Sequence, residues 1–367
     1  LWRQRILGRE IYFNFLYAPG FWLLLSAGMT YALIGMRTIS GVYHHGILPV
    51  VAFAIGWLIA EGSSDKQIRD GILALAAGFG TYATLNMLVN IGNNRYRLID
   101  FWTGTYRAAT GSGALNTLPI SVTPYAVKFE KRLPVKIMFL ALFFATIQYM
   151  FMLGTRTQFA ILLLIVILAA LQFAYSEHGI AGILKCLGIM VVISLIAFLF
   201  YHFNVLSIRD YILSTNLAAR YERRASLENS DSFRFHSFWI GLRELIQYPM
   251  GGRASQIYRH NMWLDVGRVS GIIPFCLLLI YSIKNFANVT VIWKNPKILP
   301  SLRYLLLFLY IGAYVNCFVE PIWEGALNFF LTLCVVDGMV SAMMRRLEND
   351  PNSEESVPDA SNLHADL

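Results

Sequence analysis

The stretch FAILLLIVILAALQFAY, residues 159–175, decides the fold class, because it carries no charged residue over almost the full length of a membrane-spanning helix. A helix needs about 20 mostly apolar residues to cross the hydrocarbon core of a bilayer. The next apolar stretch, residues 180–203, contains a single lysine. Two such segments in succession are typical of a protein that is embedded in a membrane.

The composition of the whole chain agrees with this interpretation. Of its 367 residues, 56% are hydrophobic and only 14% are charged, whereas soluble domains have about 25% charged residues. The four cysteines lie in apolar runs without a CxxC pair, so no disulfide framework is expected. These figures exclude a soluble globular domain everywhere except in the C-terminal tail.

Apolar runs of spanning length recur along the chain. Nine are clear, at residues 21–39, 46–60, 71–91, 135–153, 159–175, 180–203, 264–283, 302–319 and 323–344. A tenth, residues 108–127, contains glycines and prolines, which a helix tolerates where other helices surround it. If this run crosses, all eight lysines fall on one side, as the positive-inside rule requires of the cytoplasmic face. We therefore expect an all-α integral membrane protein of about ten transmembrane helices, with both ends in the cytoplasm.

The spans divide the chain into four parts. An N-terminal transmembrane helix bundle covers residues 1–203, and an extracytoplasmic loop covers residues 204–262. Further transmembrane helices occupy residues 263–347. Residues 348–367 form an acidic tail without lysine or arginine, which we expect to be disordered and cytoplasmic.

The long loop has an unusual distribution of basic residues, with eight arginines and no lysine. Arginine grips a phosphate group with two parallel hydrogen bonds, whereas lysine is a point charge. Beside a bilayer this pattern points to a phosphate-bearing lipid, although contact with head groups is the simpler explanation for any one arginine. Within the loop, apolar side chains at helical spacing predict an amphipathic helix over residues 232–248.

Three side chains on the extracytoplasmic side are candidates for chemistry. Arg234 occupies the first turn of the predicted helix, where a cation makes sense if it shares an anion with the exposed N–H groups; a pair with Asp231 explains it equally well. Arg156 lies in a short turn between two spans, and its alternative role is an interfacial contact. His260 can accept a proton near neutral pH, and Arg259 beside it would favour the neutral ring; a hydrogen-bonded polar residue is the alternative.

Signals for nucleotides and metals are absent from the sequence. There is no Walker A motif, no G-x-G-x-x-G after a strand, no H-E-x-x-H and no D-x-D pair in the loop. We therefore expect no metal, no cofactor and no nucleic-acid partner.

Four motifs occur in a characteristic order. They are ATGSGALNTLP (109–119), GTRTQFAILLL (154–164), SFRFHSFWIGLRELIQYPMGG (232–252) and HNMWLDVGRVSG (260–271). With this order, the chain resembles the O-antigen ligase and O-antigen polymerase superfamily of bacterial inner membranes over about residues 70–285. The resemblance implies a metal-independent glycosyltransferase on the periplasmic face, with a glycan on undecaprenyl diphosphate as its donor. Family members usually have more N-terminal spans, which implies that this chain is part of a longer protein.

The resemblance also implies roles for individual residues. Arg156 and Arg234 would bind the donor diphosphate, and His260 would be the general base. Possible supporting residues are Arg220, Arg223, Arg224, Arg259 and Asn261, of which the first three match no family motif.

Three functions stay open at this point. A ligase passes the glycan to lipid A–core, and a polymerase passes it to another lipid-linked glycan; the loop between Arg234 and His260 is short for a ligase. Membrane lipids surround either enzyme. A polyprenyl-lipid or polysaccharide transporter is the alternative from another class, and it should carry charges near the middle of the membrane. The charges here gather at one face, which favours the enzyme.

Overall fold

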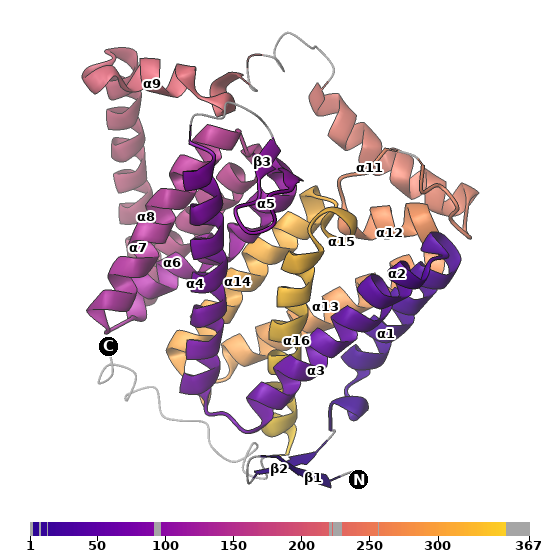
Figure 1. Ribbon diagram of the computed structural model, residues 1–367. Coiled ribbons are helices and arrows are strands. Elements are labelled where there is room, and N and C mark those ends of the chain that lie inside the picture. The colour runs from indigo at the N-terminus through magenta and orange to yellow at the C-terminus, as the bar shows by residue number, and fades with distance from the viewer. Residues whose placement is uncertain are drawn as a thin grey trace.

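The computed structural model is a bundle of long helices that run between two ends of the molecule (Figure 1). It describes residues 3–6, 9–12, 14–91, 97–219, 222, 230–255 and 257–349, so most of the acidic tail lies outside the described residues. Eight helices in this part of the chain are long and apolar enough to cross a membrane. The prediction of a helical, multi-pass membrane protein is confirmed at this level.

The long elements follow the predicted spans closely. In chain order they are α1 (Pro19–Thr30) with the π-helical turn η2 (Tyr31–Met36), α2 (Ile39–Gly41), η3 (Val42–Ile47) and α3 (Leu48–Glu61), α4 (Asp65–Val89), α7 (Leu133–Leu153), α8 (Arg156–His202), α13 (Ile272–Lys294), α14 (Pro300–Val319) and α16 (Leu327–Glu348). The shorter elements are β1 (Arg3–Ile6), β2 (Arg9–Tyr12), η1 (Asn14–Tyr17), β3 (Arg97–Ile99), β4 (Tyr106–Ala108), α5 (Ala109–Leu115), α6 (Thr117–Phe129), η4 (Val205–Ser207), α9 (Ile208–Ser214), α11 (Ser230–Gln247), α12 (Met262–Ser270) and α15 (Ile322–Gly325). The two antiparallel hairpins, β1–β2 and β3–β4, were not predicted.

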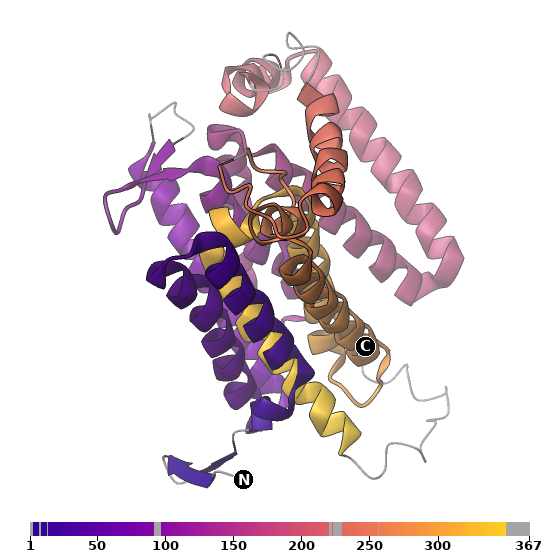
Figure 2. The same ribbon diagram turned by 90° about the vertical axis from the view of Figure 1, so that its right-hand side faces the viewer.

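Two predicted spans lie on either side of a kink in the long element α8. Residues 159–175 and 180–203 both belong to α8, which bends at Gly179, where the backbone has φ 60° and ψ −143°. The second half of α8 leaves the bundle, as Figure 2 shows, and most of its apolar side chains are exposed. Such a surface is what a helix presents to lipid.

The predicted span over residues 264–283 is wrong in its bounds. The helix breaks at Gly271, which has φ 90°, and the apolar segment that follows runs on to Lys294 as α13. Only glycine fits this break, because a Cβ atom on Gly271 would lie 2.1 Å from the carbonyl oxygen of Pro249. Lys284 consequently lies within α13 and no longer supports the one-sided distribution of lysines.

The weak span over residues 108–127 forms two short helices, α5 and α6, rather than one long helix. All residues of α6 from Thr117 to Thr123 are buried, among α4, α7, α8 and α14. The hydroxyl groups of Ser121 and Thr123 donate to backbone carbonyls one turn earlier, which satisfies them away from water. The broken helix thus lies inside protein, as expected for a segment with helix breakers.

Polar contacts define the two ends of the bundle. At one end, here called the base, hydrogen bonds and ion pairs join Asn14 to Glu61, Asp65 to Arg346 and Asp70 to Arg132. The opposite end, here called the site end, joins α8 to the end of α14 and α12 to α15. The chain reaches the site end again with α11 and α12, which lie across it in Figure 1.

Candidate functional site

The loop helix α11 covers Ser230–Gln247, close to the predicted 232–248. Its Ser237 and Leu245 are buried, and it packs on α12, where Gly267 leaves room for the Leu245 side chain. Trp239 and Ile246 point outward and are exposed. α11 therefore presents one face to the protein and another to its surroundings.

A buried ion pair fastens α11 to the segment before α12. The Arg259 guanidinium donates from Nε and Nη2 to the two carboxylate oxygens of Glu244, at 3.0 and 2.7 Å. Both side chains are buried, at 9% exposure each. Glu244 therefore balances this guanidinium, and the pair connects α11 to the loop that carries the next residue, His260.

His260 lies in an uncommon backbone conformation, with φ 54°. The buried carboxylate of Asp265 accepts hydrogen bonds from the backbone N–H groups on both sides of it, those of Arg259 at 2.6 Å and Asn261 at 3.3 Å. The Asn261 side chain caps α12 by accepting from Leu264 N at 3.0 Å. A left-handed conformation at a non-glycine residue is held only by such surroundings and is frequent at functional sites.

The imidazole of His260 faces a buried carboxylate. Its Nδ1 lies 4.0 Å from Oε2 of Glu320, whose side chain is 3% exposed. The other oxygen of Glu320 accepts a hydrogen bond from Thr157 Oγ1 at 2.5 Å. Thr157, which was not predicted, directly follows Arg156 at the start of α8, so the structure brings His260 and the sequence neighbour of Arg156 to a common carboxylate.

Four predicted arginines lie wholly or with their side chains outside the described part of the chain. The backbone of Arg234 lies in the first turns of α11, and its side chain falls outside the described part of the chain. Arg220, Arg223 and Arg224 also lie outside the described residues. The prediction that Arg156 and Arg234 lie together across the outer face therefore stays a prediction.

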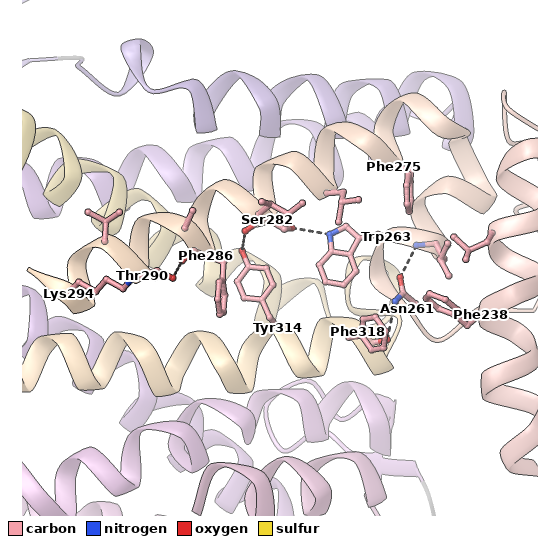
Figure 3. Close-up of a pocket in the computed structure, with 16 residues that line it drawn as sticks. Phe238, Asn261, Trp263, Phe275, Ser282, Phe286, Thr290, Lys294, Tyr314 and Phe318 are labelled. Carbon is pink, nitrogen blue, oxygen red and sulfur yellow. Dashed lines mark hydrogen bonds between the residues drawn. The ribbon is translucent and has the colours of Figure 1, made fainter. Parts of the chain in front are cut away.

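An apolar groove of about 810 Å³ has Asn261, the residue after His260, in its wall (Figure 3). Asn261, Phe238 and Phe318 line it at the site end, and it continues along α13 to Thr290 and Lys294 near the base. Two aromatic side chains of its walls direct their polar atoms to protein partners (Figure 3): Trp263 Nε1 donates to Ser282 Oγ and Tyr314 Oη donates to the Ser282 carbonyl, both at 3.0 Å.

Because these polar atoms are bonded to protein, the surface of the groove along α13 consists mainly of aromatic and aliphatic side chains. A helix of 23 residues is about 35 Å long, so the groove follows α13 over a length comparable to the thickness of a bilayer's hydrocarbon core. Its shape and lining suit a single long hydrocarbon chain.

A second buried ionic cluster was not predicted. Arg268, only 1% exposed, donates from Nη2 to both oxygens of Glu324 and from Nη1 to the carbonyls of Arg253 and Ala254, and its Nε lies 3.4 Å from Asp265. Burial raises the pKa of Glu324 to about 7. An arginine inside the apolar segment VGRVSG was the available signal, but its partners lie far away in sequence.

We expect Arg268→Gln to destabilise the protein strongly. Removal of one partner from a buried ion pair leaves an uncompensated group and costs about 3–5 kcal/mol of the free energy of unfolding. The measurement is the unfolding midpoint of the detergent-purified variant. Arg209→Gln is the matched control, because its pair with Asp210 is exposed and 4.0 Å long, and its loss should cost about 0–1 kcal/mol. Equal midpoints for the two variants would contradict the prediction.

Within the described ranges, no three His, Cys, Asp or Glu side chains are grouped as a metal site would require. Comparison with protein-family models finds no match to this chain. Comparison with curated proteins also finds no significant match. Any statement of function therefore depends on the chemistry of the site.

Proposed function

We propose that the protein is an O-antigen ligase-like glycosyltransferase, which moves a glycan from an undecaprenyl-diphosphate carrier to a sugar hydroxyl of lipid A–core. The observation that supports this most is that the His260–Glu320 pair and one end of the apolar groove are built from the same two chain segments. Asn261, next to His260, and Phe318, two residues before Glu320, both line the groove at the site end. A polar reaction centre at the end of a hydrocarbon-chain groove suits a substrate with a lipid tail and a reactive head.

Each part of the donor has a place in this proposal. The isoprenoid chain lies in the groove, and the diphosphate lies against Arg156 and Arg234, with Arg220, Arg223 and Arg224 in support. The acceptor oxygen attacks the anomeric carbon and its proton passes to His260, while the bond from that carbon to the diphosphate oxygen breaks. The arginines stabilise the negative charge that grows on the leaving diphosphate. Polyprenyl diphosphate and the extended acceptor are the products.

The proposal includes an orientation in the bacterial inner membrane, with the base in the cytoplasm and the site end in the periplasm. Counting the two halves of α8 separately and α5–α6 as a broken crossing gives ten passages. The lysines at positions 66, 128, 131 and 136 support it, because they lie at or near the base.

Reporter fusions test this orientation. A fusion at Glu130, beside the base, should report the cytoplasm, and a fusion at Ser230, the first residue of α11, should report the periplasm. Alkaline phosphatase activity reports a periplasmic location, and fluorescence of a green fluorescent protein reports a cytoplasmic one. A fusion at Glu348 is the cytoplasmic control. The same location for Glu130 and Ser230 would contradict the ten-passage topology.

A strain that lacks the protein tests the function itself. Loss of all O-antigen with an intact core in the lipopolysaccharide pattern supports a ligase. A single repeat unit on the core supports the first alternative, an O-antigen polymerase that joins lipid-linked repeat units. An unchanged pattern contradicts both enzymes in that strain.

One observation favours a second candidate, a polyprenyl-lipid transporter. Asp337 lies in the middle of α16, fully buried, and accepts hydrogen bonds from Tyr281 and Tyr310 at 2.7 and 2.5 Å. An acid within a membrane span is costly and often functional. Because two hydroxyl groups from α13 and α14 satisfy it, Asp337 also has a structural explanation, as a link between three helices. A transporter leaves the glycan on its carrier, which distinguishes it from the enzyme.

A further inference from the structure

Glu320 is the residue that joins the two predicted halves of the site. It follows α14 directly, and its carboxylate is contacted by Thr157 of α8 on one oxygen and faces His260 with the other. The sequence predicts that the turn at residues 320–324 lies on the same side of the membrane as Arg156 and the loop, but it does not predict these contacts, because Glu320 stands 60 residues from His260 and 163 from Thr157.

The position of this carboxylate is set by rigid neighbours. Its backbone N–H donates to the Asn316 carbonyl at 2.9 Å, and its own carbonyl accepts from Ile322 N at 2.9 Å, which fixes the turn between α14 and α15. The Asn316 side chain donates to Thr117 Oγ1 of α6 at 3.0 Å. Three helices thus hold Glu320 where it meets the imidazole.

The backbone of His260 is equally well fixed, since Asp265 holds the N–H groups on both sides of it. The orientation of the ring then depends on the groups that face it. Among the described residues, the charged groups around His260 are Glu320 after α14, Asp265 on α12 and the neighbouring Arg259, which is paired with Glu244 of α11. Arg156 precedes Thr157 on α8. Of these, Glu320 is the carboxylate that faces a ring nitrogen.

We propose that Glu320 is a positioning residue that accepts a hydrogen bond from His260 Nδ1–H during turnover and leaves Nε2 unprotonated for the acceptor hydroxyl. This proposal rests on the proposed function. The proton moves from the acceptor oxygen to Nε2 as that oxygen bonds to the anomeric carbon, and the electron pair of the broken bond leaves with the diphosphate. Glu320 takes up no proton; its charge stabilises the imidazolium that forms. Thr157 holds the carboxylate in place and connects it to the helix start that carries Arg156.

The first test is enzymatic and uses substitutions at Glu320 and Thr157. Glu320→Gln keeps the size of the side chain, but its amide can donate a hydrogen bond to Nδ1 and favour the tautomer that carries its proton on Nε2. Turnover should therefore fall about 10²–10⁴-fold, with little change in the KM for the donor. Glu320→Asp should retain more activity because it keeps the charge. Thr157→Val should lower turnover, and Thr157→Ser, which keeps the hydroxyl group, should restore it. Full turnover by Glu320→Gln would overturn the proposal.

The pH profile separates positioning from a general loss of structure. Without the negative charge of Glu320 the protonated imidazole is less stable, so the acidic limb of the pH–rate profile should move to lower pH. Asp210→Asn is the control: Asp210 is an exposed carboxylate of the same loop, outside the buried ion pairs, so its loss should leave the acidic limb in place. If the acidic limb of the pH–rate profile of Glu320→Gln lies at the same pH as that of the wild type, the proposal is overturned.

The second test does not depend on enzymatic activity. Diethyl pyrocarbonate modifies the neutral imidazole, so the pH dependence of His260 labelling, read by peptide mass spectrometry, reports the protonation of this ring. The labelling midpoint should lie lower in Glu320→Gln than in the wild type. If the wild type transfers no glycan while the midpoint still moves, the proposed function fails and the pairing of Glu320 with His260 stands. Identical midpoints would overturn the pairing whether or not the protein is active.

Discussion

Replacement of His260 by glutamine is expected to lower turnover by about 10²–10⁴-fold. Glutamine keeps a hydrogen-bond donor and an acceptor near Glu320 but cannot take a proton near neutral pH. Donor binding should persist, because our proposal assigns it to the arginines and the groove. The measurement is the rate of glycan transfer by the purified variant with a lipid-linked donor, together with binding of the same donor.

The wild-type rate provides a second check on His260. It should fall at acidic pH, because a protonated imidazole cannot accept the proton of the acceptor hydroxyl. Near wild-type turnover by His260→Gln would end its role as a base and leave it a positioning role. The left-handed backbone at this position, held by Asp265, would then be a structural feature of the α12 start.

Replacement of Arg156 by lysine is expected to lower kcat/KM by about 10²–10³-fold, since removal of one charge-stabilising donor from a preorganised site has an effect of this size. Lysine keeps the charge but cannot form the two parallel hydrogen bonds that arginine makes to a phosphate group. The same result is expected for Arg234→Lys. Transfer rates of the purified variants measure both effects.

Arg209→Lys is the control for this pair. Arg209 belongs to the same Arg-rich loop, lies on α9 and is largely exposed, so its substitution should leave transfer unchanged. Full transfer by Arg156→Lys at a normal protein level would contradict the phosphate contact and favour an interfacial role for this side chain.

The helical architecture could be predicted because uncharged runs such as residues 159–175 have few alternatives to a membrane span. One error has a local cause. Gly271 breaks the predicted span 264–283, because the carbonyl of Pro249 approaches it closely, and hydropathy alone does not register such a contact. At Gly179 a non-helical backbone kinks α8, so residues 159–175 and 180–203 lie on either side of a kink, in line with their prediction as separate segments.

The site was predictable only where its residues are neighbours in sequence. The end of the loop predicts Arg259, His260 and Asn261 as candidate site residues, and the structure gives each of them specific contacts. Glu320 and Glu324 come from a turn far along the chain, and their contacts with His260 and Arg268 arise from packing between helices. The interpretation of Arg259 also changed, because Glu244 binds the guanidinium that would have acted on His260.

The central claim is that the groove and the His260–Glu320 pair serve glycan transfer from a polyprenyl-diphosphate donor. The most direct measurement reconstitutes the chain in liposomes with this donor and, in separate reactions, lipid A–core or a second lipid-linked glycan as acceptor. We predict glycan on an acceptor, most readily on lipid A–core, with an equal amount of released polyprenyl diphosphate, and about 10²–10⁴-fold slower formation of both products with His260→Ala. An intact donor after incubation of the folded wild-type chain with both acceptors would contradict it.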